Sequence, residues 1–187
     1  MNKRTLTLSA LLVLLDIQLG VPLSMICKRE ITLRKGRLYR FQTAPVDPYD
    51  AFRGRYVALG IGQRSVKTDD PDNIGSGQRV YVTLSEDTNG FARLSRATHR
   101  RPRDEDYLRM RVSYISGNDV HFVLPFDRYY MNEKDAPRAE SLYREHSRRE
   151  EQDAFIAVRV LNGFPVIEDL YVNDKPIMEF LEEKNQE

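Results

Sequence analysis

The sequence predicts a mainly β (α+β) protein, in which an N-terminal transmembrane helix is followed by an antiparallel β domain with one inserted helix. Three features lead to this prediction. Residues 1–27 are nearly free of charge, whereas charged residues are frequent in the rest of the chain. Most of that remainder consists of short runs in which apolar and polar residues alternate, which is typical of half-buried strands. One longer, charged segment between these runs has the ion-pair spacing of a helix.

The composition excludes several classes of protein. The 187-residue chain has 29 Lys and Arg residues against 28 Asp and Glu residues, a formal net charge of +1. A nucleic-acid binder normally needs a basic excess for its phosphate contacts, so we expect no nucleic-acid partner. The content of 10 Gly, 9 Pro and 1 Cys excludes collagen-like and disulfide-rich proteins. A hydrophobic share of 41% is enough for a packed core.

The predicted transmembrane helix is the apolar segment Leu6–Cys27. As a helix it would be about 33 Å long, close to the ~30 Å hydrocarbon core of a bilayer. Basic pairs flank it at 3–4 and 28–29, where long side chains can reach the lipid headgroups. The alternative is a cleavable secretory signal, but the far end has no small-x-small cleavage site. We therefore expect an uncleaved signal-anchor over residues 1–29 and a soluble domain over residues 30–187.

The residues around the span leave its orientation open. The basic residues that follow it between Lys28 and Arg37 place the domain in the cytoplasm by the positive-inside rule. The position of the span at the start of the sequence, with the order of a secretory signal, favours export of the domain instead.

Asp16 lies near the middle of the predicted span. A carboxyl group at that depth costs about 2.5–3.5 kcal/mol on insertion scales unless it is protonated or paired. Two interpretations follow. Asp16 contacts a transmembrane helix of a membrane partner, or it is a neutral side chain that the preceding apolar residues make tolerable.

Turn signals separate the predicted strands of the soluble domain. Pro45 ends the first strand, and residues 69–77 form a loop because they are rich in Asp, Pro, Asn and Gly. Residues 89–90 (Asn-Gly) supply a hairpin turn, and residues 117–118 (Gly-Asn) supply another turn. The predicted strands are Leu38–Gln42, Arg55–Ile61, Gln78–Ser85, Phe91–Thr98, Tyr107–Ile115, Val120–Leu124, Ala154–Leu161 and Val166–Val172.

One helix is predicted over residues 137–152. Pro137 suits a first-turn position, and Asp135 can cap the helix. Glu140 precedes Arg144 by four residues, the favourable order for a helix ion pair. We interpret the charge of this segment as a solvated face.

No complete catalytic or cofactor motif is present. The three histidines, His99, His121 and His146, have no metal-ligand spacing among them. No Walker loop, Rossmann glycine pattern or G-x-S-x-G elbow occurs. We therefore expect no metal, no cofactor and no enzymatic activity.

The most informative stretch is TAPVDPYDAFRGRYVALGI, residues 43–61. Its part PVDPYDAFRGRYVAL (residues 45–59) resembles the signature of the GDYXXLXY family, in which a Pro-Val-Asp-Pro stretch leads through Arg-Gly-Asp-Tyr into a strand. Residues 80–84 resemble the strand that follows, and Asp127-Arg128-Tyr129-Tyr130 with Glu140 resembles a second block of that family. The chain departs from the signature at Arg55, where the family has Asp, and at Ile61, where it has Tyr.

The resemblance implies a bacterial, membrane-anchored protein with a β-rich domain of unknown biochemical activity. It also implies an exported domain and a polytopic membrane protein as a partner, so we place the protein in the bacterial inner membrane with a periplasmic domain. The signature residues that could line a binding site are Asp47, Arg53, Tyr56, Asp127, Arg128 and Glu140. The alternative is that they form a buried ion network that fixes the fold, where removing one member would cost about 3–5 kcal/mol.

Three functions follow from these observations. The favoured one is a non-enzymatic accessory or scaffold subunit that docks on a membrane partner through its anchor and Asp16. The second is a ligand-binding module with a pocket near Arg53 and Arg128. The third is a degenerate signal-peptidase-like domain. An active signal peptidase needs a Ser nucleophile and a Lys base. Between Gln42 and Gly54 there is no Ser, and Thr43 carries the one hydroxyl apart from that of Tyr49.

Overall fold

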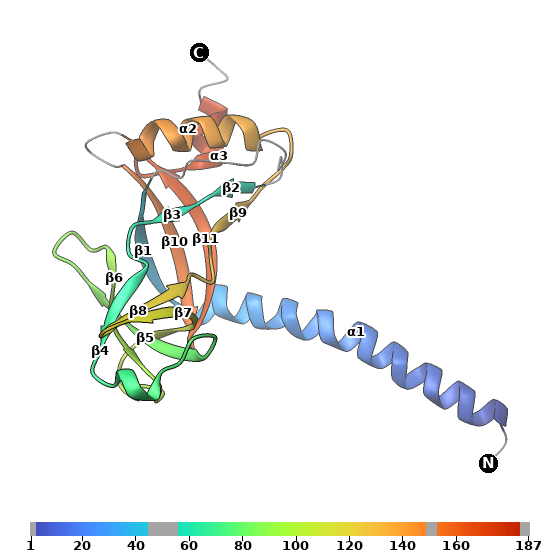
Figure 1. Ribbon diagram of the computed structural model, residues 1–187. Coiled ribbons are helices and arrows are strands. Elements are labelled where there is room, and N and C mark those ends of the chain that lie inside the picture. Colours follow the sequence, from blue (N-terminus) through green and yellow to red (C-terminus); the bar gives the residue numbers. More distant parts are fainter. Residues whose placement is uncertain (1–2, 45–55, 149–152, 184–187) are drawn as a thin grey trace.

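A long N-terminal helix projects from a domain built of strands in the computed structural model of the chain (Figure 1). The structure describes residues 3–44, 56–148 and 153–183. The helix, α1 (Lys3–Lys35), continues through the predicted boundary at residue 29 to the first strand of the domain. The predicted order of an apolar helix followed by a mainly β domain is confirmed.

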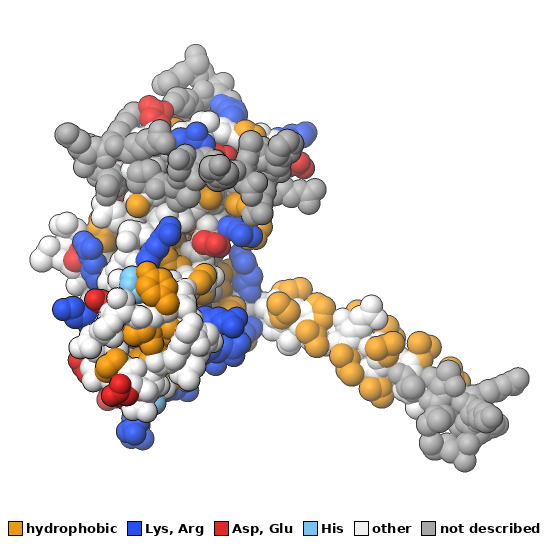
Figure 2. Space-filling view, in the orientation of Figure 1, with side chains coloured by type: hydrophobic (Ala, Val, Ile, Leu, Met, Phe, Trp, Pro, Cys, Tyr) orange, Lys and Arg blue, Asp and Glu red, His pale blue; other side chains and the backbone are white. Residues whose placement is uncertain are grey.

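The apolar side chains of α1 are exposed along the helix, which Figure 2 shows as an orange rod outside the domain. Leu11–Lys35 is long and apolar enough to cross a membrane, and within the described part of the chain it is the one helix with this property. A signal sequence would meet the same test. The last turn of α1 packs on β10 and β11, strands of the first sheet below, where Thr32 is buried.

The strand that follows α1 belongs to a five-stranded antiparallel sheet with the order β12-β11-β10-β1-β3. Its central strand, β10, is buried at nearly every position, because both faces of the sheet are covered. The strands of this sheet are β1 (Arg37–Ala44), β3 (Gly60–Ile61), β10 (Ala154–Leu161), β11 (Phe164–Val172) and β12 (Lys175–Pro176).

A second group of five strands closes into a barrel with the order β4-β6-β5-β7-β8. Its pairs are antiparallel except for β4 and β6, which are parallel, so the predicted antiparallel arrangement holds for all but this pair. Phe41 of the first sheet packs on Phe126, which follows β8 in the chain; the two ring centroids are 5.2 Å apart. The barrel strands are β4 (Ser65–Thr68), β5 (Arg79–Glu86), β6 (Ala92–Thr98), β7 (Tyr107–Ser116) and β8 (Asp119–Val123).

The stretch predicted as one strand over Arg55–Ile61 is divided in the structure. Tyr56–Ala58 forms β2, which pairs with β9 (Arg128–Tyr130), whereas Gly60–Ile61 is β3 and pairs with β1. The prediction of one continuous strand was wrong, because the two halves pair with different strands. Arg55 lies outside the described residues.

Two helices lie at the end of the domain away from the barrel (Figure 1). The predicted inserted helix is α2 (Ala136–Arg148), and a short helix, α3 (Ile177–Glu183), packs beside it. The charged residues of α2 form only one of its faces, since Ala139, Leu142 and Tyr143 are buried on the other. The predicted solvated face is therefore half of an amphipathic helix.

Candidate functional site

The two signature blocks lie side by side, because β2 pairs with β9. Tyr56 is opposite Tyr130, with ring centroids 5.7 Å apart, and Ala58 is opposite Arg128. The ribbon continues beyond the strands, where the backbone N–H of Leu59 donates to the carbonyl of Asp127 at 2.9 Å. Residues about 70 positions apart in the sequence thus form one ribbon.

Arg128 is the centre of this ribbon's exposed face. Its guanidinium lies 5.0 Å from the centroid of the Tyr56 ring, and its Nε is 3.7 Å from a carboxylate oxygen of Asp127. A hydrogen bond with Tyr130 and the charge of Asp127 raise the pKa of Arg128. The side chains of Arg128 and Asp127 are 41% and 60% exposed, so both remain accessible to a ligand or a partner.

The other signature residues are not part of this group. Glu140 lies on α2 and pairs with Arg144 of the same helix at 3.0 Å, as the sequence predicts. Asp47 and Arg53 lie outside the described residues. The interpretation of a buried ion network is wrong for Asp127 and Arg128, because neither side chain is buried.

Replacing Arg128 by alanine is expected to leave the fold intact. The side chain makes an exposed ion pair and an exposed contact with an aromatic ring, and such interactions add little to stability. The midpoint of thermal unfolding, followed by circular dichroism in detergent, should stay within about 3 °C of wild type. Arg144→Ala, which removes an exposed helix ion pair, is the control. A loss of about 3–5 kcal/mol in Arg128→Ala would instead point to a buried network.

Tyr143 ties α2 to the strands on both sides of the signature segment. Its hydroxyl donates to the carbonyl of Ala44 at 3.1 Å and accepts from the backbone N–H of Gly60 at 3.2 Å. Burial raises the pKa of Tyr143, so the phenol stays neutral. Sequence reasoning missed this role, although a Tyr at helical spacing from Ala139 is the pattern of a buried helix face.

Tyr129 fixes the same ribbon from its buried face. Its hydroxyl donates to a carboxylate oxygen of Asp169 at 2.7 Å, and Asp169 is on β11 of the first sheet. Burial, followed by this hydrogen bond, raises the pKa of Tyr129. The side chains of Tyr129 and Arg128 alternate along β9, so that one anchors the ribbon and the other is presented outward.

A second polar cluster connects the start of β1 to the barrel. The Tyr39 hydroxyl donates to Asp106 at 2.7 Å, and Arg37 pairs with Glu86 at 3.1 Å and with Asp106 at 3.4 Å. Burial and the hydrogen bond to Asp106 raise the pKa of Tyr39. A phenol with a raised pKa is a poor general base, so the cluster is suited to joining the two sheets.

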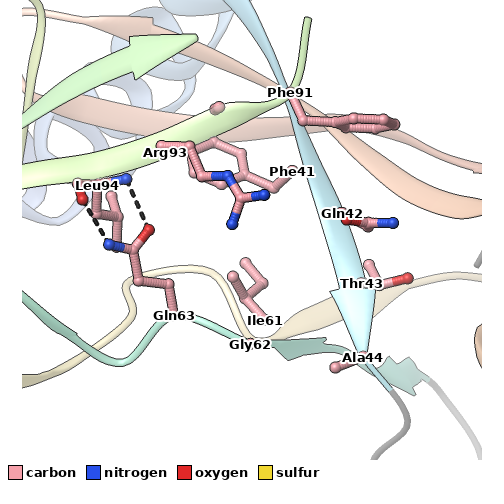
Figure 3. A pocket seen from close by; sticks show the side chains of 11 residues that line it. Phe41, Gln42, Thr43, Ala44, Ile61, Gly62, Gln63, Phe91, Arg93 and Leu94 are labelled. Atoms are coloured by element: carbon pink, nitrogen blue, oxygen red, sulfur yellow. Dashed lines mark hydrogen bonds between the residues drawn. The ribbon is translucent and has the colours of Figure 1, made fainter. Parts of the chain in front are cut away.

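A cavity of about 570 Å³ lies between β1, β3 and β6 (Figure 3). The Gln63 side chain closes one side of it by donating to the carbonyl of Leu94 and accepting from its N–H at 2.9 Å. Arg93 points into the cavity, and its guanidinium is paired with Asp87 at 3.1 Å. Thr43 carries the one hydroxyl on the described lining, and it donates to the carbonyl of Ala154 at 2.8 Å.

The described lining of the cavity therefore presents no set of groups suited to nucleophilic catalysis. A hydroxyl nucleophile needs an adjacent base, but the hydroxyl of Thr43 is hydrogen-bonded to the main chain, and no described lining residue is Asp, Glu, His or Lys. The described lining residues are Phe41, Gln42, Thr43, Ala44, Ile61, Gly62, Gln63, Phe91, Ala92, Arg93 and Leu94.

The histidines occupy separate places. His146 is buried and lies 2.9 Å from Asp153, His99 lies 3.2 Å from Asp70, and the ring of His121 stacks on that of Tyr114 at 4.1 Å. Within the described ranges, no three His, Cys, Asp or Glu side chains are grouped so that they could hold a metal ion.

Comparison with known proteins identifies a family for this chain. Residues 18–170 match the family described as GDYXXLXY protein, a range that includes half of α1, the barrel, the β2–β9 ribbon and α2. No curated protein and no solved structure matches the chain. The match covers most of the chain, and on that basis this protein belongs to the GDYXXLXY family.

Proposed function

We propose that this protein is a non-enzymatic, single-span accessory or scaffold subunit of a bacterial inner-membrane complex, with its β domain in the periplasm. The observation that carries the proposal is the continuity of α1. The helix leaves an apolar segment of membrane length and enters the first sheet with no linker, since β1 begins at Arg37.

The end of α1 is built into the domain, which supports an anchor that is retained. Thr32 is buried against the sheet, and its hydroxyl donates to the carbonyl of Lys28 at 2.9 Å. The N–H of Gly36 donates to the carbonyl of Thr32 at 2.8 Å and closes the helix. A helix joined in this way would hold the β domain at a fixed height above the bilayer, as a scaffold requires.

Asp16 supports a partner within the membrane. It lies on α1 on the same face as Gly20 and Ser24, which follow at intervals of four residues. Small residues let helices approach closely, and a carboxyl group at this depth is costly unless it is paired. We infer that this face contacts a transmembrane helix of a polytopic protein.

The exposed ribbon favours ligand binding as a second candidate function. Arg128 holds its charge outward beside Tyr56, an arrangement suited to an anionic group on a peptide or small molecule. The side chains of Arg128 and Asp127 are both exposed, so a ligand would reach them from the surface. The experiment below tells the two candidate functions apart, because it changes Asp16, which is not part of the ribbon.

The proposal is tested by affinity purification of the full chain from detergent-solubilised membranes, followed by mass spectrometry. Wild type should recover a polytopic membrane protein in a stoichiometric amount, and Asp16→Leu should lose it. Gln18→Leu is the matched control, because it removes another polar group from the span about 200° further round the helix. If every form is recovered alone, or if Asp16→Leu retains the partner, the proposed contact is wrong.

A further inference from the structure

A groove with four basic side chains lies where α1 joins the domain. It has a volume of about 660 Å³ and is lined by Lys28 of α1, Arg79 of β5, and Arg109 and Arg111 of β7. Figure 1 shows β7 and the lower ends of β10 and β11 next to the base of α1, and Figure 2 shows basic side chains gathered there. Lys28 directly follows the apolar segment, so the groove is level with the lipid headgroups if α1 spans the bilayer.

The charge of this groove is not neutralised by the described residues. None of those that line it is acidic, and Lys28, Arg79 and Arg109 form no ion pair with any described side chain. Arg79 and Arg111 are directly opposite each other on antiparallel strands. Like charges in that arrangement are destabilising, and a bound anion would offset their repulsion.

Contacts within the domain hold two of the four basic groups in place. The Lys28 ammonium lies 4.0 Å from the centroid of the Phe164 ring, and Nε of Arg111 donates to the carbonyl of Gly77 at 3.2 Å. Arg109 is two residues from Arg111 and therefore on the same face of β7. Two of the four cations are thus positioned before any ligand binds.

Apolar side chains form the rest of the groove. Val123 is 61% exposed, and Phe164 and Pro165 lie beside it on the lining. A surface that combines cations with exposed apolar groups fits the boundary between phosphate groups and acyl chains. A soluble anion would use the cations alone.

We propose that this groove binds the phosphate of an anionic phospholipid, such as phosphatidylglycerol, in the leaflet next to the β domain. The proposal rests on the anchoring of α1 in a membrane. Its consequence is that the lipid holds β5 and β7 against the bilayer and so fixes the rotation of the domain about α1.

The test uses the full chain purified in a zwitterionic detergent with equal amounts of phosphatidylglycerol and phosphatidylcholine. Retained lipid is counted by native mass spectrometry. Wild type should retain phosphatidylglycerol with a preference of about tenfold or more, since several basic side chains act together. The variant Arg79→Gln/Arg111→Gln should lose this preference, and Lys28→Gln should weaken it without any change to the barrel.

The matched control is Arg93→Gln/Arg96→Gln, which removes the same charge from β6, where Asp87 and Asp69 pair these arginines. It should keep the preference for phosphatidylglycerol. Equal retention of both lipids by wild type, or an equal loss in the control, would overturn the proposal. Displacement of the lipid by millimolar inorganic phosphate would also overturn it, because the site would then take a soluble anion.

A failure of the lipid proposal can be told apart from a failure of anchoring. A chain that resists carbonate extraction but shows no lipid preference contradicts the groove alone. A chain that carbonate releases from membranes contradicts the anchor itself.

Discussion

Replacing Gly36 by alanine is expected to lower the free energy of unfolding by about 2–3 kcal/mol, as overpacking of a rigid site does. A Cβ at this position would lie 2.5 Å from the carbonyl oxygen of Thr32 and 3.1 Å from backbone atoms of Val160. These are main-chain atoms of α1 and of the central strand β10, and they cannot move aside as a flexible side chain would. The substitution should therefore loosen the junction between α1 and the first sheet.

Urea unfolding in detergent, followed by circular dichroism, measures this effect. Gly62→Ala is the matched control, because a Cβ at Gly62 meets no atom within 4 Å. We expect this control to be neutral or slightly stabilising, since alanine restricts the unfolded chain. Equal stability of the two variants would contradict the close packing of the helix end on β10.

The second large effect is expected for Phe41→Ala, which should cost about 3–5 kcal/mol. Phe41 is 1% exposed and packs on Phe126, so it joins the first sheet to the chain that leaves the barrel. Its removal would enlarge the cavity of Figure 3, whose lining would not collapse because Gln63 is fixed to Leu94. Loss of a buried ring that joins the first sheet to the segment after β8 should also lower the cooperativity of unfolding.

Leu38→Ala is the control for this prediction, since Leu38 is on the same strand and is 39% exposed. We expect it to lose about 1 kcal/mol or less, because much of its side chain is already in water. Comparable losses in the two variants would show that Phe41 does not carry the contact between the first sheet and the segment after β8.

Local patterns were sufficient to predict most of the strands. Alternation placed β5, β7 and β10 within one or two residues, and the Asn-Gly turn before β6 is confirmed by Gly90, whose φ is +77°. These elements have strong periodicity and are bounded by turn residues. The helix α2 was also predicted, with its start one residue from the observed one, whereas its predicted end at residue 152 lies outside the described residues.

The elements that were missed depend on partners far away in the sequence. β4 and β9 have four and three residues, and they are strands only because β6, β8 and β2 lie beside them. The helix α3 has seven residues, too few to be stable alone, and it forms because Ile177 and Leu181 are buried. Closure of the barrel is equally non-local and has no local pattern.

The candidate sites also divide into one that the sequence indicated and one that only the folded chain creates. The family resemblance singled out Tyr56 and Arg128, and pairing of β2 with β9 brings them together. It also singled out Glu140, but Glu140 forms an ion pair with Arg144 of the same helix, α2. The basic groove could not be predicted, since Lys28 and Arg79 come from separate elements that only the folded chain brings together.

The measurement that tests the account most directly is carbonate extraction of membranes that contain the full chain with a C-terminal tag, followed by peptide mapping of both fractions. If α1 is a retained anchor, the tagged chain stays in the pellet and still yields peptides from the region of Leu11–Lys35. If the tagged chain is released and begins near residue 28, α1 is a cleaved signal. The scaffold proposal and the lipid groove would then both be wrong.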